Sequence, residues 1–579
     1  MFSVFTKLKW FFKENWGRYT TAVILLTVAN IIEVIPPKII GNTIDAIHTK
    51  ELTTELLWNY IIALVALLFA AYIVNFIWQY QLFGGANVLQ KDLRMKLMDH
   101  FLRMRPPFYE RNRTGDLMAR STNDLQAVSE TAGFGIMTLL DSTLYLGTII
   151  IMMGVTTSWK LTLAALLPLP LLAIALQQIG KFIHKRYTIS QAAFGELNDS
   201  VLEAVEGVRV VRAYVQECEM EKQFAQKTEE VVEKNLRVSR VNGLFAPVSK
   251  FITAFSYVIG LGYGAYLVSI NDITVGSLVA FNVYLGMAVW PMMAIGELIN
   301  TMQQGNASLD RVSETLNEKE DVPNPKERKV VQTPTTIRFN DVSFQYPLSK
   351  SLNLKNVNIE LHRGETLGIV GKTGSGKTTI VKQLLREYPH GEGDVEIANE
   401  AIQLQDKEQV LNWIGYVPQS HILFSRTIRD NIRFGKPDAT EEDIARAIRM
   451  ANFEDDLKRL PDGLDTMVGE KGISLSGGQK QRISIARAFI RNPEILILDD
   501  SLSAVDAKTE SRIIDNIQNE RKDKTTIIVT HRLSAILHAE KIVIVDDGEI
   551  IQYGTHDELV RQPGWYQEQF KLQQVKGGE

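Results

Sequence analysis

The chain has 579 residues, of which 45% are hydrophobic and 22% charged, and its formal net charge is -4. This length allows several domains, and the small net charge without a strongly basic stretch argues against a nucleic-acid partner. The single cysteine, Cys218, excludes an intrachain disulfide and a cysteine-based metal site. Residues 1–310 contain long apolar runs, whereas residues 335–570 have the composition of a soluble α/β domain.

The first 17 residues combine several aromatic side chains with Lys7, Lys9 and Lys13. This mixture is typical of an amphipathic helix that lies on a membrane surface, and it differs from a cleavable signal. We therefore predict an elbow helix over residues 1–17.

Residues 18–312 are predicted to form a transmembrane domain of six helices. Each apolar segment reaches the roughly 20 residues that are needed to cross a bilayer. The segments lie near residues 20–47, 57–83, 133–156, 161–183, 244–270 and 277–302. Buried helices of a soluble core would need shorter and more interrupted apolar runs.

Basic residues predict how these helices are oriented. They are concentrated between the second and third spans and between the fourth and fifth, while the three short connections contain only Lys50 and Lys160. By the positive-inside rule, both long segments and both termini are cytoplasmic. We therefore expect a multi-pass protein of the plasma membrane.

Several residues at membrane depth are candidates for a substrate cavity, because ionisable groups are costly there and usually face a cavity or a partner. The alternative is that the acids face a water-filled vestibule or cap helix ends, and that the aromatic residue only packs. The candidates are Glu33, Asp141, Trp290 and Glu297.

The polar residues 313–335, with three prolines, predict a linker, and residues 336–570 predict a nucleotide-binding domain followed by a tail over 571–579. The apolar run Leu367–Val370 leads directly into a glycine-rich loop and then a helix, which is the context that a P-loop requires. The candidate ATP-binding residues of this loop are Gly371, Lys372, Thr373, Gly374, Ser375, Gly376, Lys377, Thr378 and Thr379.

The residue types of this loop suit a nucleotide phosphate. Glycines let backbone N–H groups surround the phosphates, and the dipole of the following helix adds positive potential. Lys377 is expected to reach the β- and γ-phosphates, and the Thr378 hydroxyl can bind Mg²⁺. Asp499 ends the apolar run Ile495–Leu498 and is suited to hold Mg²⁺ through water. ATP and Mg²⁺ are therefore the predicted ligands.

These motifs resemble the ATP-binding cassette (ABC) family position by position, and the resemblance covers residues from about 15 to 570. The most specific element is the signature sequence Leu475, Ser476, Gly477, Gly478 and Gln479. The resemblance implies an α-helical six-span transmembrane domain of the type IV ABC exporter fold, followed by an α/β P-loop ATPase domain. Exporters usually carry both parts on one chain, whereas importers usually separate them.

Further roles are implied by the resemblance. Tyr346 is expected to stack on adenine, Gln419 to contact Mg²⁺ and the attacking water, and His531 to sense the γ-phosphate. Taken singly, Gln419 and His531 would more often be structural. The D-loop, which crosses the dimer interface in this family, corresponds to Ser503, Ala504, Val505 and Asp506.

Two cytoplasmic segments, Arg113–Arg120 and Glu206–Tyr214, resemble the coupling regions that dock into the ATPase domains of ABC exporters. Each contains a glycine that marks a break before a short polar helix. The alternative is that each is a plain turn of a helical hairpin.

The resemblance also implies a dimer. In this family two ATPase domains pair head to tail, and the signature of one closes on the ATP that the P-loop of the other binds. A chain with six spans is therefore expected to be half of the functional unit.

Asp500 departs from the family pattern, in which glutamate follows the Mg²⁺-linked aspartate and orients or deprotonates the attacking water. A base must lie within roughly 2.6–3.2 Å of its proton, and an error of about 1 Å can cost on the order of 100-fold in rate. With Asp500, His531 and Gln419 as catalytic candidates, we expect ATP binding with slow hydrolysis. Alternatively, a shift of the backbone lets Asp500 serve adequately.

An intact signature beside a shortened acid favours a heterodimer with a second ABC half-transporter chain that carries its own glutamate. The resemblance to heterodimeric multidrug-type exporters implies export of amphipathic small molecules across the lipid bilayer. A homodimeric exporter and an ATP-switched regulatory subunit are the alternatives.

Overall fold

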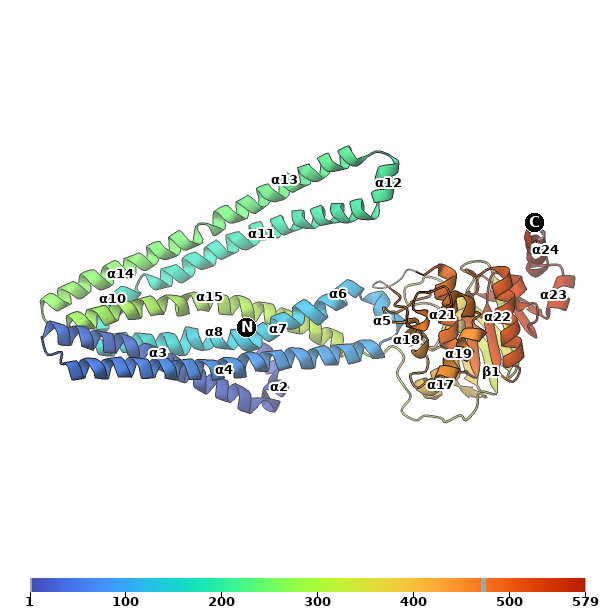
Figure 1. Cartoon of the computed structure of the whole chain (residues 1–579), viewed down its shortest axis with the longest axis horizontal. Helices are drawn as coiled ribbons and strands as arrows, with labels where there is room; N and C mark the ends of the chain where they lie inside the picture. Colours follow the sequence, from blue (N-terminus) through green and yellow to red (C-terminus); the bar gives the residue numbers. More distant parts are fainter. Residues whose placement is uncertain (1–2, 470–474, 578–579) are drawn as a thin grey trace. The chain divides into compact units, whose positions relative to one another are not determined.

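The computed structural model describes residues 3–469 and 475–577. The chain forms two compact units, coloured along the sequence in Figure 1. The membrane unit comprises Met1–Leu102 and Thr114–Glu318, and the ATPase unit comprises Arg103–Arg113 and Lys319–Glu579.

The chain begins with two short helices, α1 (Ser3–Lys7) and α2 (Lys9–Glu14), where one elbow helix was expected. Val4, Leu8 and Phe11 are fully or almost fully buried, in one apolar cluster with side chains of the long helices that follow. Part of the apolar face of this segment therefore packs against protein, because the chain turns back onto its own bundle.

In the part of the chain that the structure describes, six helical spans are long and apolar enough to cross a membrane, which confirms the prediction. They contain 33 to 53 residues each, well beyond the roughly 20 that a bilayer requires. The first and second are α3 (Trp16–His48) and α4 (Thr54–Arg103), the fourth is α10 (Trp159–Leu166) with α11 (Leu169–Glu206), the fifth is α13 (Glu217–Asn242) with α14 (Phe245–Ser269), and the sixth is α15 (Val275–Asn317).

The third span is interrupted by π-helical segments, which the hydropathy of the sequence did not predict. It runs through α6 (Thr114–Ala119), η1 (Arg120–Asp124), α7 (Leu125–Glu130), η2 (Thr131–Gly135), α8 (Ile136–Leu140), η3 (Asp141–Tyr145) and α9 (Leu146–Thr156). Short π-helical insertions are rare and frequently occur at functional sites. The third of them begins with Asp141, one of the residues singled out at membrane depth.

The second predicted coupling segment forms an exposed tip. Helices α11 and α13 run side by side in Figure 1, and α12 (Val208–Ala213) joins them. A hydrogen bond of 2.7 Å from Ser190 Oγ to Asn235 Oδ1 connects the two long helices. Val208 and Val210 on α12 are exposed, so this short helix presents apolar side chains outward. Its role in coupling stays a prediction.

The first predicted coupling segment follows the short helix α5, and its role in coupling stays a prediction. The short helix α5 (Pro106–Arg111) belongs to the ATPase unit, whereas the predicted segment 113–120 falls mainly in α6 of the membrane unit. Arg111 forms an ion pair of 3.0 Å with Asp321, and Tyr388 donates a hydrogen bond to Glu110. Prolines at the first two positions of α5 separate it from α4, because proline suits a helix start but not a helix interior.

The ATPase unit contains two β-sheets. The antiparallel sheet has the order β2-β1-β4-β5, with β1 (Thr336–Phe344), β2 (Leu354–His362), β4 (Glu392–Ile397) and β5 (Glu400–Ala401). The second sheet has the order β10-β9-β3-β8-β7-β6, with β3 (Thr366–Gly371), β6 (Ile414–Val417), β7 (Ile495–Asp499), β8 (Thr525–Val529), β9 (Lys541–Asp546) and β10 (Glu549–Gly554). Its strands are parallel except β10.

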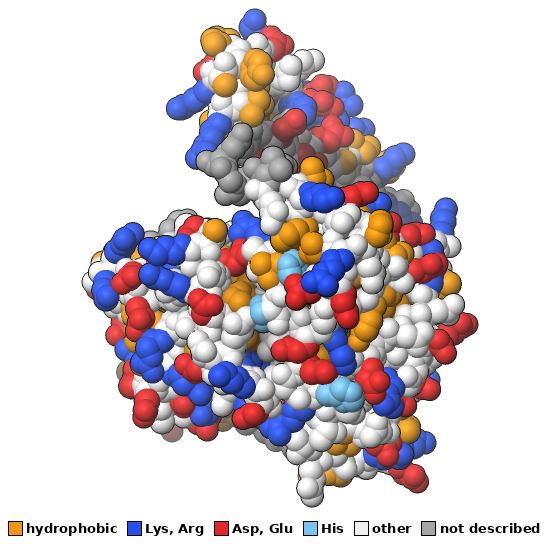
Figure 2. Space-filling model, turned by 90° about the vertical axis from the view of Figure 1, so that its right-hand side faces the viewer, with side chains coloured by type: hydrophobic (Ala, Val, Ile, Leu, Met, Phe, Trp, Pro, Cys, Tyr) orange, Lys and Arg blue, Asp and Glu red, His pale blue; other side chains and the backbone are white. Residues whose placement is uncertain are grey.

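Helices cover these sheets, and two apolar clusters fill the space between the layers. The helices are α16 (Lys377–Leu384), η4 (Ile402–Leu404), α17 (Lys407–Trp413), α18 (Ile428–Arg433), α19 (Glu441–Met450), α20 (Glu454–Leu457), η5 (Gly463–Asp465), α21 (Gly477–Phe489), α22 (Ala507–Glu520), η6 (Leu533–Ile536), α23 (His556–Arg561) and α24 (Trp565–Gly577). Basic and acidic side chains are interspersed over the face of this unit that Figure 2 shows, as on a solvated surface.

The domain boundaries shift slightly from the prediction. Strand β1 begins at Thr336, as expected for a domain starting at residue 336. Helix α15 continues to Asn317, inside the predicted linker, because Thr315 is buried and its hydroxyl bonds to the Arg311 carbonyl. Helix α24 extends through Gly577, so most of the predicted tail 571–579 is helical.

Helices α3 and α15 approach each other closely where two glycines meet. A Cβ atom on Gly276 would lie 2.0 Å from the Gly41 carbonyl oxygen. Beside this contact, Asp45 at the end of α3 accepts hydrogen bonds from the Gly276 N–H (2.7 Å) and the Thr274 hydroxyl (2.6 Å). The start of α15 is therefore fixed to the end of α3.

We predict that Gly276→Ala destabilises the membrane unit by about 1–3 kcal/mol, because the added methyl group meets backbone that cannot rotate away. Gly296→Ala on the same helix is the matched control, since a Cβ there meets nothing within 4 Å. Thermal unfolding of the purified full chain in detergent measures both. Equal melting temperatures for the two variants would contradict this packing.

Candidate nucleotide site

The glycine-rich loop connects β3 to α16 with a backbone that side chains would obstruct. Gly376, at the N-cap of α16, has φ 108°. A Cβ on it would lie 2.9 Å from the Asn353 carbonyl oxygen, and one on Gly371 would lie 2.0 Å from the Val545 carbonyl oxygen. The loop therefore needs glycine at both positions to keep its shape.

Lys377 is buried at the start of α16, with 7% of its side chain surface exposed. Its Nζ donates to the carbonyl oxygens of Gly371 (3.0 Å) and Lys372 (2.6 Å), so the ammonium group curls over the loop. Burial lowers the pKa of Lys377, and the nearby Asp500 and Asp499 act in the opposite direction. Lys372, by contrast, is exposed and pairs with Asp546 at 3.3 Å.

Asp499 ends β7 and is almost completely buried, with 1% exposure. Its Oδ1 accepts a hydrogen bond from the Thr378 hydroxyl (3.0 Å), and its Oδ2 accepts one from the Tyr416 hydroxyl (3.3 Å). Burial raises the pKa of Asp499 above its ordinary value, whereas the two hydrogen bonds lower it. Carboxylate and hydroxyl oxygens are ligands that Mg²⁺ accepts, so Asp499 and Thr378 fit the predicted ion.

Asp500 follows in a left-handed backbone conformation, with φ 47°. Aspartate tolerates this region better than most residues do. Its N–H donates to the Val529 carbonyl (2.8 Å), and its own carbonyl accepts from the Ser503 hydroxyl (2.9 Å). The backbone at Asp500 is thus tied to β8 on one side and to the D-loop on the other.

A cavity of about 430 Å³ lies at the carboxyl ends of β3, β7 and β8. Ligands of open α/β sheets bind at this edge of the strands. The cavity brings together most of the predicted site: it is lined by Tyr346, Thr373, Gly374, Ser375, Gly376, Lys377, Thr378, Thr379, Gln419, Asp499, Asp500 and His531. In addition, the buried Ser375 hydroxyl has no hydrogen-bond partner among the described residues, so it can donate to a phosphate oxygen.

Tyr346 lines the cavity and is half-buried. Its hydroxyl donates to Thr379 Oγ1 (3.1 Å), and its ring meets the edge of Tyr388 with centroids 4.8 Å apart. The ring is therefore held in one orientation before any base stacks on it.

His531 follows β8 and lines the cavity. Burial lowers its pKa, and the positive charge of Lys377 lowers it further. Both effects favour the neutral imidazole, in which one ring nitrogen donates and the other accepts.

The signature residues and the D-loop do not line this cavity. Leu475 and Ser476 lead into α21, and Ser476 forms a capping box with Gln479. A Cβ on Gly478 would lie 2.9 Å from the Ala504 carbonyl oxygen, and the Ala504 N–H donates to Gln481 Oε1 (3.1 Å). The signature and the D-loop therefore pack against each other, and they lie away from the phosphate-binding loop of their own chain.

Tyr416 and Asn353 are among the residues of the site that the sequence analysis did not identify. Tyr416 contacts Asp499, and Asn353 lines the cavity and passes its carbonyl close to Gly376. Tyr416 could have been suspected from its place near the end of a short apolar strand, three residues before Gln419. Asn353 has no comparable signal, because only the pairing of β1 with β2 brings it to the loop.

The residues predicted at membrane depth are only partly assembled. Asn30 Nδ2 on α3 donates to Asp141 Oδ1 at 3.4 Å, and Glu33 lies close enough to Asp141 to interact electrostatically. Trp290 and Glu297 lie on α15 at exposed positions. The structure thus joins the two acids of α3 and η3 into one polar group.

Comparisons with known proteins agree with this division. Residues 19–292 match the family described as the ABC transporter transmembrane region, and residues 354–503 match the family described as ABC transporter. The chain is 58% identical over 575 residues to the probable multidrug resistance ABC transporter ATP-binding/permease protein YheI of Bacillus subtilis, covering 99% of this chain and 98% of that protein.

It is also 38% identical to the multidrug resistance-like ATP-binding protein MdlA of Escherichia coli, over 99% of this chain and 97% of that protein. The solved structure of a bacterial Atm1-family ABC exporter with ATP bound has a TM-score of 0.81 at 24% identity, covering 96% of this chain and 99% of that one. The latter likeness establishes the fold.

We predict that Lys377→Ala weakens ATP binding about 10- to 100-fold, because it removes a charge-assisted contact to phosphate in a dry site. Lys372→Ala, which alters an exposed lysine of the same loop, should change binding by less than about twofold. Photolabelling of this chain by 8-azido-ATP, competed with unlabelled ATP, gives both affinities. Similar losses in the two variants would mean that Lys377 does not face the phosphates.

Proposed function

This chain belongs to the ABC transporter family, and we propose that it exports amphipathic compounds across the plasma membrane as one half of a dimer. The observation that carries the proposal is the cavity at the carboxyl ends of β3, β7 and β8. It gathers Tyr346, the glycine-rich loop, Gln419, Asp499, Asp500 and His531 on a chain that also has six candidate membrane spans.

In this proposal ATP binds with its phosphates in the loop between β3 and α16. Backbone N–H groups and the start of α16 surround the phosphates, and Lys377 releases the loop carbonyls to contact them. Thr378 and Asp499 would hold Mg²⁺, with Gln419 beside them on the cavity wall. The ion supplies positive charge that neutralises the phosphate oxygens.

Asp500 supports the further proposal that hydrolysis at this site is slow. Its backbone is tied to Val529 and Ser503, so the chain has little freedom to advance a carboxylate that is one methylene shorter than glutamate. Misplacement by about 1 Å can cost on the order of 100-fold in rate. The site would retain ATP longer than it hydrolyses it.

The position of the signature supports pairing with a second chain. Gly477 and Gly478 lie beside the D-loop and do not line the cavity of their own chain. The N-terminus of α21 can therefore present its N–H groups to a nucleotide that another chain binds. We propose that this other chain is a different ABC half with glutamate in place of Asp500. In this arrangement the present chain resembles BmrC, the Asp-bearing half of the bacterial BmrCD exporter.

The substrate proposal is that transported compounds are amphipathic and include cations. The names of the relatives YheI and MdlA refer to multidrug resistance. In this chain, Asp141 and Glu33 place two carboxyl groups together within the membrane unit, and acidic groups at such depth favour a positively charged partner. Both termini and the ATPase domain are proposed to be cytoplasmic, in agreement with the basic segments.

The composition of the complex is tested by the native mass of the tagged chain after extraction from its own membranes. A complex of about twice 65.3 kDa that contains a second, different ABC half supports the heterodimer. A dimer of this chain alone would place Asp500 in both ATP sites and would replace the asymmetric arrangement with slow or regulatory use of ATP.

We predict that Asp500→Glu raises ATP turnover at this chain's site by roughly 10- to 100-fold, because the longer side chain brings the carboxylate into reach of the attacking water. Phosphate release by the purified complex measures turnover. Asp523→Glu, at an exposed turn after α22, is the matched control and should leave the rate unchanged. An unchanged rate in Asp500→Glu would show that Asp500 already serves as an adequate base.

We predict that Asp141→Asn reduces the stimulation of ATPase activity by a cationic amphipathic dye about fivefold or more, because a cation loses a charged partner at low dielectric. Glu297→Gln, at an exposed position on α15, tests whether the second group of candidates contributes. Stimulation by an uncharged amphipathic compound should change little in Asp141→Asn. Equal losses for both compounds would argue against recognition of charge.

A further inference from the structure

The loop that carries His531 is held from outside by the last helix of the chain. Gln573 on α24 donates from Nε2 to the His531 carbonyl (2.9 Å) and accepts at Oε1 from the Leu533 N–H (2.9 Å). The two bonds bracket Arg532, so a single side chain fixes the backbone on both sides of it. Together with the bond from the Thr530 N–H to the Ile369 carbonyl of β3 (3.1 Å), this clamp limits where His531 can lie in the loop between β8 and η6.

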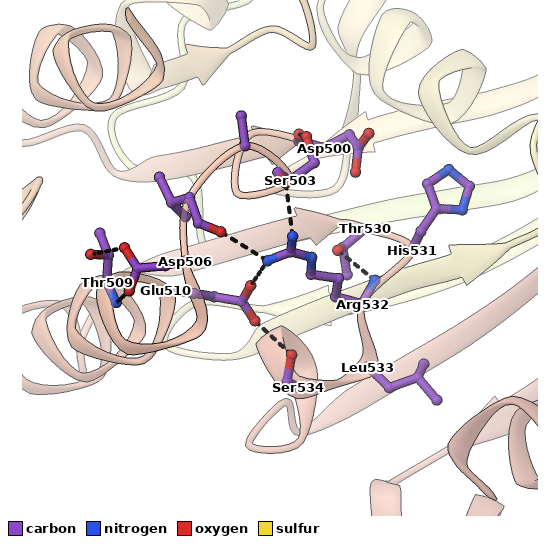
Figure 3. A network of polar contacts seen from close by, with 12 residues as sticks. Asp500, Ser503, Asp506, Thr509, Glu510, Thr530, His531, Arg532, Leu533 and Ser534 are labelled. Carbon is purple, nitrogen blue, oxygen red and sulfur yellow. Dashed lines mark hydrogen bonds and ion pairs between the residues drawn. The ribbon is translucent and has the colours of Figure 1, made fainter. Parts of the chain in front are cut away.

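Arg532 connects the same loop to the D-loop (Figure 3). Its guanidinium donates to the carbonyl oxygens of Ser503 (2.8 Å) and Val505 (3.1 Å) and to Glu510 Oε2 (2.7 Å). Glu510, at 4% exposure, also accepts from the Ser534 hydroxyl (2.6 Å). A buried carboxylate with several donors holds its partner strongly, so the direction of Arg532 is defined.

The helix that carries Gln573 is itself anchored. Tyr566 near the start of α24 is fully buried, and its hydroxyl lies 2.8 Å from His556 Nδ1. Its N–H donates to Gln552 Oε1 (3.2 Å), and Gln567 Nε2 donates to the Val560 carbonyl (2.8 Å). These contacts fix α24 to β10 and α23. The position of the Gln573 backbone relative to the sheet is therefore fixed as well.

We propose that Gln573 is a positioning residue for His531, and that it acts through the backbone to hold the imidazole toward the γ-phosphate. Because Arg532 lies between the two bonds, the same clamp also orients the D-loop. The proposal rests on the role proposed above for His531. It assigns a role to Gln573 on α24, a helix outside the residues 354–503 that match the ATPase family.

The test compares nucleotides with and without a γ-phosphate in the full-length complex. This chain is photolabelled with 8-azido-ATP, and the label on its own gel band is competed with AMP-PNP or with ADP. Gln573→Ala is expected to weaken AMP-PNP about 3- to 10-fold, the equivalent of one or two neutral hydrogen bonds, and to leave ADP unchanged. Gln574→Ala, which changes the adjacent exposed glutamine of α24, is the matched control and should affect neither nucleotide.

A His531→Ala background separates the possible failures. If Gln573 acts through His531, adding Gln573→Ala to His531→Ala should give no further loss of AMP-PNP affinity. Equal weakening of AMP-PNP and ADP by Gln573→Ala, or no change in either, would overturn the positioning role. If His531→Ala itself leaves the AMP-PNP affinity unchanged, the role assigned to His531 is wrong, and the positioning role of Gln573 falls with it.

Discussion

The nucleotide site depends on one buried carboxylate. Asp499 is 1% exposed and is held by the hydroxyl groups of Thr378 and Tyr416. The surroundings that raise the pKa of Asp499 by burial also lower those of Lys377 and His531. In a partly buried pocket each contact with phosphate is stronger than it would be in bulk water. The arrangement of strands that buries Asp499 is therefore also what makes the lysine and the histidine effective.

The second property of the site is that the signature and the D-loop lie outside the cavity that their own chain forms. The signature lies against the D-loop, and the D-loop is tied by Arg532 to the loop that carries His531. The loop that carries His531, the D-loop and the signature are thus parts of one connected network. In the proposed heterodimer, the partner has glutamate where this chain has Asp500. This network would then connect the slow ATP site of this chain to the faster ATP site of the partner.

In the membrane unit, breaks between long helices place short helices in different surroundings. Prolines at the start of α5 end the second span and place a short helix in the ATPase unit, where Glu110 bonds to Tyr388. At the tip between α11 and α13, Gly207 precedes α12, where Val208 and Val210 are exposed. Each break is local in sequence, but its consequence depends on what the next few residues contact.

The sequence by itself determined the two halves, the six spans and the core of the ATP site, because those features are local: an apolar run has a length, and a P-loop is a strand, a loop and a helix in succession. The Asp500 departure was visible for the same reason. Only the tertiary structure showed that Tyr416 bonds to Asp499, that Gly276 meets Gly41, that α5 falls in the ATPase unit and α6 in the membrane unit, and that Gln573 reaches back 42 residues to His531. These contacts depend on which strands and helices become neighbours, and the periodicity of the sequence does not determine these neighbours.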